Sequence, residues 1–168
     1  DWLIENRVEV VLPPLFEFFT QSFVNSKVNQ REYLEHSAPF SFIGSLIGWR
    51  ANYLINKFEK IIGKYNYYRP VHSIEHEAKE AEKILSLANQ YGEGWLIPAE
   101  ISAFARQGIT DVICMQPFGC IANHVVGKGM EKKIRKFYPE VNLLFLDFDY
   151  GTSRVNVLNR LHFLMQNQ

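Results

Sequence analysis

Thr110 to Met115 (TDVICM) and Asn142 to Phe148 (NLLFLDF) are two short apolar runs of the kind that form buried strands. The segment between them, Lys128 to Tyr138, has helical character and ends at Pro139. Nearly continuous apolar runs suit parallel strands that are covered on both faces. A strand, a helix and a second strand in this order form a right-handed βαβ unit. The sequence therefore predicts an α/β fold in which a short parallel sheet, Rossmann-like in type, is flanked by helices.

A third apolar run near the start of the chain, Val8 to Leu12, predicts a further strand of the same parallel sheet. Pro13 and Pro14 end this run and favour a helix from Leu15 to about Val24. Ser73 is typical of a residue that caps the N-terminus of a helix. Helical periodicity predicts three more helices, at residues 74–91, 98–107 and 155–165.

Residues 27–72 form a segment of different character, with a helical pattern from about Ile47 to Gly63. We interpret this segment as a helical excursion within a single α/β domain that spans residues 1–168. The chain begins at Asp1 and its first methionine is Met115, so we expect it to be a fragment of a larger protein. The excursion is rich in aromatic side chains, among them Phe40, Phe42, Trp49, Tyr53, Tyr65, Tyr67 and Tyr68.

The composition is that of one globular domain without an overall charge. Of the 168 residues 47% are hydrophobic, and the 18 basic side chains balance the 18 acidic ones. A chain without net charge has no overall field to attract nucleic acid, and no apolar run is long enough to span a bilayer. Two cysteines cannot make a disulfide framework, so they are expected to be free thiols or metal ligands. We therefore expect a cytoplasmic protein that associates with neither nucleic acid nor membrane.

The segment Gln116 to His124 follows the run Thr110 to Met115, at the sheet edge where open α/β proteins bind ligands. Gly119 permits a close backbone approach and sets Cys120 at the tip of a loop, near the basic N-terminal part of the next helix, which favours a thiolate. A lone cysteine is also commonly a buried apolar side chain, and Cys114, inside the strand, fits that second interpretation better. His124 is either a ligand, an acid-base group or a hydrogen-bond partner in this site, or a structural histidine.

Two carboxylates end the last apolar run. Asp147 and Asp149 are two positions apart, so a strand would point them to the same face. They either contact a ligand or cation at the strand end, or they cap the last helix together with Ser153. Because ligand loops gather at the carboxyl ends of parallel strands, we expect both carboxylates to lie close to Cys120.

Several motifs occur in order between Gly92 and Met165. They are GEGWLIP (92–98), QPFGC (116–120), HVVGKG (124–129), Tyr138-Pro139, NLLFLDFD (142–149) and VNVLNR (155–160). In this order they resemble the C-terminal region, the dehydratase-like part, of the 2-hydroxyglutaryl-CoA dehydratase activator family, also called CoA-substrate-specific enzyme activases. These large proteins fuse an ATP-dependent activase to dehydratase-like sequence. Tyr150 departs from the family pattern, in which a proline is common at this position.

The resemblance implies an iron-sulfur-associated domain of an ATP-dependent activator of 2-hydroxyacyl-CoA dehydratase, supporting low-potential electron transfer. It implies that Cys120 is one metal ligand of a 4Fe-4S cluster in the full-length protein, with Gly119, His124, Asp147 and Asp149 beside the cofactor. The other cluster ligands would lie outside this chain, and ATP would bind only in the missing activase part, so the fragment alone would be inactive.

The expected partners are a 2-hydroxyacyl-CoA dehydratase or other segments of the parent chain. Two other functions are compatible with the sequence. One is a subunit-like domain of a 2-hydroxyacyl-CoA dehydratase that borders the acyl-CoA site. The other is a non-catalytic interaction module in which the aromatic excursion docks a partner and Cys120 is merely buried.

Overall fold

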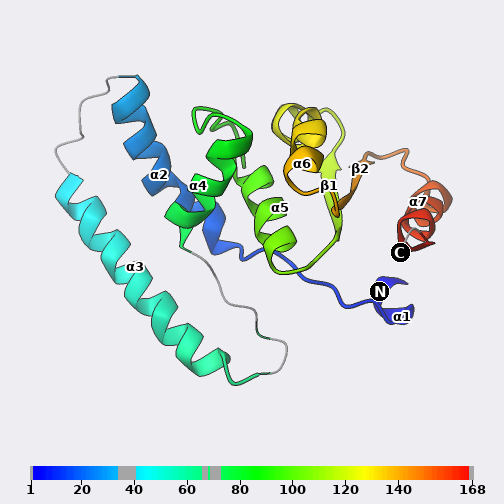
Figure 1. Ribbon diagram of the computed structural model, residues 1–168, viewed down its shortest axis with the longest axis horizontal. Helices are drawn as coiled ribbons and strands as arrows, with labels where there is room; N and C mark the ends of the chain where they lie inside the picture. The colour runs from blue at the N-terminus through cyan, green and yellow to red at the C-terminus, as the bar shows by residue number, and fades with distance from the viewer. Residues whose placement is uncertain (1, 34–40, 66–67, 69–72, 167–168) are drawn as a thin grey trace.

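The computed structural model describes residues 2–33, 41–65, 68 and 73–166, with the backbone alone for 41–45, 47 and 51–52. It is a mixed α/β structure in which helices predominate (Figure 1). None of the helices in these ranges is both long and apolar enough to cross a membrane. The α-helices are α1 (Trp2–Glu5), α2 (Phe16–Glu32), α3 (Ser41–Ile62), α4 (Ile74–Ile84), α5 (Leu96–Arg106), α6 (Glu131–Phe137) and α7 (Arg154–Gln166). The strands are β1 (Asp111–Pro117) and β2 (Asn142–Phe148), and the short helical turns η1 (Asn123–Gly127) and η2 (Lys128–Met130) precede α6.

The sheet consists of β1 and β2, which pair in parallel from Asp111 opposite Asn142 to Pro117 opposite Phe148. Helices α5 and α6 lie on one side of the sheet and α7 lies on the other (Figure 1). Leu143 and Phe145 are buried in the core on the first side, and Leu146 is buried on the side of α7. The predicted short parallel sheet flanked by helices is therefore confirmed, whereas its assignment to the Rossmann-like type stays a prediction.

The loop before α5 sets the position of the core. Gly94 has φ +50°, and a Cβ atom there would lie 2.2 Å from the carbonyl oxygen of Asn89, so only glycine fits. The next residue, Trp95, is completely buried, and its indole Nε1 donates a hydrogen bond to Asn25 Oδ1 of α2 at 2.7 Å. This contact satisfies the indole donor inside the core and fastens α2 to the start of α5.

The predicted helices agree with the structure except at some ends. Ser73 caps α4, as predicted, because its hydroxyl accepts a hydrogen bond from the backbone N–H of His76 at 3.3 Å. The same helix was expected to continue to Tyr91 but ends at Ile84. Leu85 is extended and buried, so the chain leaves the helix to place this side chain in the core. The helix predicted after the two prolines continues as α2 to Glu32, past the expected start of the excursion at residue 27.

The strand predicted at Val8 to Leu12 does not form, and this part of the prediction is wrong. The segment is irregular, and a cavity between it and the C-terminal end of α3 is lined by Val10, Leu12 and Ile62 together with Tyr65 and Tyr68. A strand needs a neighbouring strand to accept and donate its backbone hydrogen bonds. The segment meets only the C-terminal end of α3 at this cavity and pairs with neither strand of the described sheet.

Carboxyl groups of three helices lie in the interior between α2, α4 and α5. Burial, and to a smaller extent the nearby charge of Glu77, together raise the pKa of Glu17 from 4.5 to about 7. Burial also raises the pKa of Glu100 to about 8, with smaller contributions from Glu17, Glu93 and Glu77. The two carboxylate oxygens of Glu77 accept hydrogen bonds from Arg106 Nη2, at 3.2 and 3.3 Å. The interior therefore compensates the charge of Glu77 and favours the protonated forms of Glu17 and Glu100.

Replacing Glu17 by Gln should flatten the pH dependence of stability. The folded-state pKa of Glu17 is raised from 4.5 to about 7, so the folded protein holds this proton more tightly than the unfolded chain does. The stabilising contribution is complete below pH 4.5 and is lost as the pH rises to about 7. We expect Glu17→Gln to raise the free energy of unfolding at pH 8 by about 1–2 kcal/mol, since water still screens part of the charge, with little change at pH 4.

Urea denaturation between pH 4 and pH 8 measures this difference. Glu140→Gln, at an exposed position, removes one carboxylate without changing the interior and is the matched control. Equal pH dependence in wild type and Glu17→Gln would show that the Glu17 carboxyl is not held protonated by its surroundings.

Candidate functional site

The chain leaves β1 through a tight turn that remains attached to the end of β2. The backbone N–H of Phe118 donates to the carbonyl oxygen of Phe148 at 2.9 Å, one step beyond the paired strands. Gly119 follows with φ +77°, a conformation that favours glycine, and the N–H of Cys120 donates to Pro117 O at 3.2 Å. These contacts hold Cys120 at the carboxyl end of the sheet, as the sequence predicts.

Cys120 directly precedes the helical part of the crossover. Helical backbone starts at Ile121 and passes through the π-helical turn η1, so the expectation that the helix starts at Lys128 is wrong by several residues. The carbonyl of Cys120 accepts the N–H of His124 at 3.0 Å, and Cys120 Sγ accepts Asn123 Nδ2 at 3.1 Å. Free amides at a helix start and a side-chain N–H both stabilise negative charge on a nearby sulfur.

His124 links this turn to β2. Its Nδ1 lies 2.9 Å from the carbonyl oxygen of Cys120. Since a carbonyl oxygen can only accept, Nδ1 carries the proton in this contact. The other ring nitrogen, Nε2, lies 3.7 Å from Asp147 Oδ1. The imidazole therefore sits between the cysteine backbone and the carboxylate that ends β2, and it has no contact with Cys120 Sγ among those described.

Gln116 is the fourth polar residue of this group, beside Cys120, His124 and Asp147. It was not predicted from the sequence. Its side chain is 2% exposed, and Nε2 donates a hydrogen bond to Asp147 Oδ1. Its Oε1 is buried and has no hydrogen-bond partner among the described residues. An unpaired buried acceptor costs free energy, so a buried glutamine at a strand end marks a polar site rather than packing. The one signal in the sequence was an amide residue closing an otherwise apolar run.

Asp149 belongs to a different arrangement. Its Oδ1 accepts the backbone N–H of Gly151 at 2.9 Å and the hydroxyl of Thr152 at 2.8 Å. The carboxylate thus orders the turn before α7, and its described contacts are with this turn rather than with the first amides of the helix. The structure brings Cys120, His124 and Asp147 together through direct contacts and leaves Asp149 outside them.

Cys114 is placed differently from Cys120. It lies inside β1, opposite Phe145, and packs against the core. Burial raises the pKa of its thiol to about 12, with smaller contributions from the charges of Glu100 and Glu131. A thiol with such a pKa is almost entirely protonated at neutral pH and is a poor metal ligand or nucleophile.

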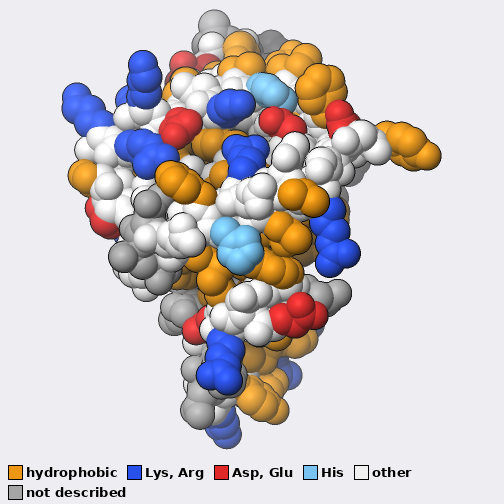
Figure 2. Space-filling view, turned by 90° about the vertical axis from the view of Figure 1, so that its right-hand side faces the viewer, with side chains coloured by type: hydrophobic (Ala, Val, Ile, Leu, Met, Phe, Trp, Pro, Cys, Tyr) orange, Lys and Arg blue, Asp and Glu red, His pale blue; other side chains and the backbone are white. Residues whose placement is uncertain are grey.

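The surface around Cys120 is apolar. Met115, Phe118 and Ile121 are each about 70% exposed, and Val125 is half exposed. The side of the molecule drawn in Figure 2 also carries basic and acidic side chains interspersed with hydrophobic ones, without a large area of one charge. Hydrophobic contact is therefore the better-supported attraction for anything that covers the Cys120 turn.

Comparison of the chain with protein-family models, with curated proteins and with solved structures gives no match. Within the part of the chain that the structure describes, no group of three or more His, Cys, Asp or Glu side chains is arranged to hold a metal ion. The site is accordingly defined by its geometry: one half-buried thiol directly before a helix start, with an amide, an imidazole and a carboxylate beside it.

The two cysteines should differ in reactivity. At pH 7.5 we expect iodoacetamide to modify Cys120 much faster than Cys114, because Cys114 packs against the core and its pKa is raised to about 12. Mass spectrometry of peptides at successive times gives the two rates, and unfolding in urea should abolish the difference. Comparable rates in the folded protein would show that Cys114 is not protected by the core.

Proposed function

We propose that this chain is an iron-sulfur-associated domain of an ATP-dependent activator of 2-hydroxyacyl-CoA dehydratase, in which Cys120 supplies one thiolate ligand of a 4Fe-4S cluster. The observation that supports this function best is the placement of Cys120 at the carboxyl end of β1, directly before a helix start. Its Sγ accepts an N–H from Asn123 at 3.1 Å. The sequence motifs around Cys120, in their order along the chain, support the choice of an iron-sulfur protein of the dehydratase-activator class.

The cysteines of this chain can supply one of the ligands of a 4Fe-4S cluster. A 4Fe-4S cluster is held by cysteine thiolates, commonly four. The chain has two cysteines, and Cys114 lies within the strand with a strongly protonated thiol. The remaining ligands must therefore come from other polypeptide, and the exposed apolar side chains of Met115, Phe118 and Ile121 offer that polypeptide a surface to cover.

The residues of this chain would position and tune the thiolate. A bound 4Fe-4S cluster supplies one-electron transfer at low potential. The Asn123 amide and the first helical N–H groups favour negative charge at Cys120 Sγ. His124 and Asp147 fix the helix start against the end of β2, and Gln116 fixes Asp147. ATP hydrolysis, in this proposal, takes place in the activase part outside the chain.

Removing the Cys120 thiol should remove a cluster ligand without unfolding the domain. In the parent protein, reconstituted with iron and sulfide, we expect Cys120→Ala to lose most of its cluster, read from iron content and from the electron paramagnetic resonance signal of the reduced cluster. The Cys120 side chain is half-buried and is not among those packed against the hydrophobic core, so the unfolding transition of the domain should change little.

Cys114→Ala is the matched control. It should retain the iron content of the wild type and reduce the free energy of unfolding by about 1 kcal/mol, as expected for a small side chain lost from the core. Normal iron content in Cys120→Ala would defeat the ligand assignment.

A second candidate function, docking of a partner on the helical excursion, is favoured by the exposed surface of α3. Trp49 is 63% exposed and stacks on Tyr53, and Phe58 and Ile61 are similarly exposed. Of the other aromatic residues, Tyr68 is half-buried and donates its hydroxyl to Glu59 Oε1 at 2.9 Å, while Phe40 and Tyr67 lie outside the described residues. Exposed apolar residues that follow one helix are typical of an interaction surface.

Polar substitutions on α3 test the docking function. We expect Trp49→Gln with Phe58→Gln to leave the free energy of unfolding within about 0.5 kcal/mol, because both side chains are solvent-exposed. The same variant should bind the remaining segments of the parent protein, supplied as a separate polypeptide, at least about tenfold more weakly in calorimetry. Lys57→Gln on the same helix is the control, and an unchanged affinity in the double variant would argue against docking on α3.

A further inference from the structure

The outer edge of β2 carries a row of backbone carbonyls that face away from β1. Asn142 N–H donates to Thr110 O at 2.7 Å, and Phe118 N–H donates to Phe148 O, so the even-numbered residues of β2 face β1. Strand residues alternate in this respect, and the odd-numbered ones direct their carbonyl and amide groups outward. The carbonyls of Val141, just before the strand, and of Leu143, Phe145 and Asp147 therefore line the outer edge of the sheet.

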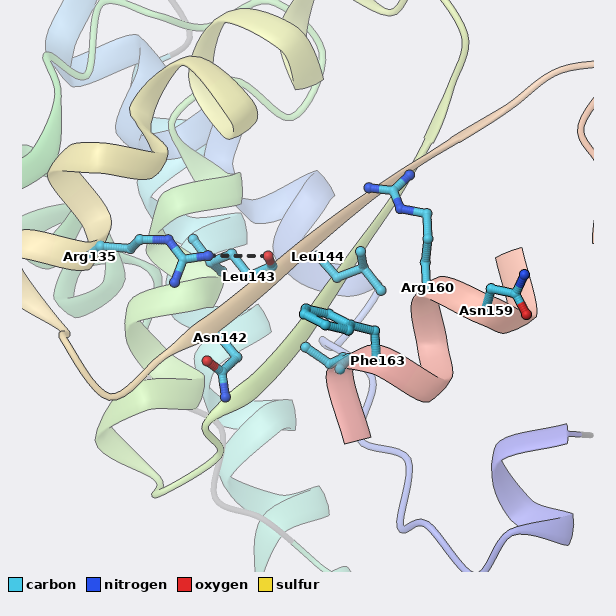
Figure 3. A pocket seen from close by; sticks show the side chains of 8 residues that line it. Arg135, Asn142, Leu143, Leu144, Asn159, Arg160 and Phe163 are labelled. Carbon is cyan, nitrogen blue, oxygen red and sulfur yellow. Dashed lines mark hydrogen bonds between the residues drawn. The ribbon is translucent and has the colours of Figure 1, made fainter. Parts of the chain in front are cut away.

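Two arginines from opposite sides of the sheet bind this row of carbonyls. Arg135 of α6 donates from Nη1 to Val141 O at 3.2 Å and from Nη2 to Leu143 O at 3.4 Å. Arg160 of α7 donates from Nη2 to Phe145 O at 2.8 Å. Figure 3 shows the two side chains converging on β2 from their separate helices. Guanidinium groups thus occupy the carbonyls of Val141, Leu143 and Phe145, and the next outward carbonyl, that of Asp147, accepts the hydroxyl of Thr152 at 3.4 Å.

The two arginines line the same groove. A cavity of about 420 Å³ runs along β2 between α6 and α7, lined by both arginines and by Asn142, Leu144 and Phe163 among others. Phe163 is largely exposed at its margin. The strand itself, NLLFL, has no charge and no proline before Asp147, and such segments pair readily with copies of themselves when an edge is free.

We propose that Arg135 and Arg160 close the outer edge of β2 to strand addition by a second copy of this chain, so that β2 is the terminal strand of the sheet. An incoming strand would have to displace three guanidinium hydrogen bonds before it could donate its own N–H groups to the same carbonyls. Edge-to-edge pairing of two copies would also bring four cationic groups together along one seam, and like charges at that distance repel. Charged side chains on an exposed edge are a known means by which sheets avoid such pairing.

Arg135 is held in place by the protein and Arg160 is less constrained. Nε of Arg135 donates to Glu131 Oε1 at 3.0 Å, one turn earlier on α6, which orients its guanidinium toward the strand. Arg160 lies at an exposed position of α7, and its contact with Phe145 O is the shortest of the three. Both arginines are needed in this arrangement, because each covers a different part of the row.

Removing both side chains should open the edge. We expect Arg135→Ala together with Arg160→Ala to self-associate with a constant at least about tenfold tighter than that of the wild type, measured by sedimentation velocity over a range of concentrations. On association, the amides of Leu143 and Phe145 should become protected from hydrogen exchange, because they would now pair with the second copy. Lysine at both positions should restore much of the wild-type behaviour, since it retains the charge and one donor.

Lys132→Ala together with Arg154→Ala is the matched control. These residues are exposed on the same two helices, so the control removes equal charge without touching the row of carbonyls. The proposal fails if the folded double alanine variant stays as monomeric as the control, or if it associates without protection of Leu143 and Phe145. Should that variant not fold, Arg160→Ala compared with Arg160→Lys decides the matter, because closure requires the alanine variant alone to associate more tightly.

Discussion

Parallel pairing of β1 with β2 requires a crossover, because the end of the first strand lies a full strand length from the start of the second. Residues 118–141 form this crossover. It brings the Cys120 turn and the end of β2 to the same edge of the sheet. The Phe118 to Phe148 hydrogen bond fixes that edge. The contacts among Cys120, His124 and Asp147 all depend on this parallel register, since they join the crossover to the carboxyl end of β2.

Helix α5 supplies the surface against which the crossover packs, and the glycine loop before it decides where that surface lies. Gly94 allows a backbone turn that no other residue could adopt beside Asn89. Trp95 can then enter the core and bind Asn25 of α2. The core beneath the sheet and the helical layer formed by α2 and α4 are thereby connected through one buried indole.

The sequence predicts correctly those structural features whose signals lie within a short stretch of the chain. The apolar runs of β1 and β2 are short and nearly continuous, and Ser73 is a strong N-cap, so these features were predicted correctly. Val8 to Leu12 has the composition of a strand, but pairing depends on a free neighbouring edge, which composition does not reveal. Helical backbone from Ile121 was also missed, because isoleucine, asparagine and valine near the start of the crossover have weak helix propensity and the structure forms a π-helical turn there. Gln116 was missed because burial of a single polar side chain is a tertiary property.

The separation of the three tryptophans gives the protein a built-in optical reporter. Trp95 is completely enclosed with its N–H bound to Asn25, whereas Trp49 is largely in water on α3 and Trp2 stands edge-on to His162 beside α7. Indole emission shifts to longer wavelength when the ring meets water, so Trp95 should emit at the blue side of the spectrum and Trp49 at the red side. Quenching by a small anion such as iodide would act on Trp49 first. The undocking of α2 from the core could therefore be followed by fluorescence, separately from events on the exposed excursion.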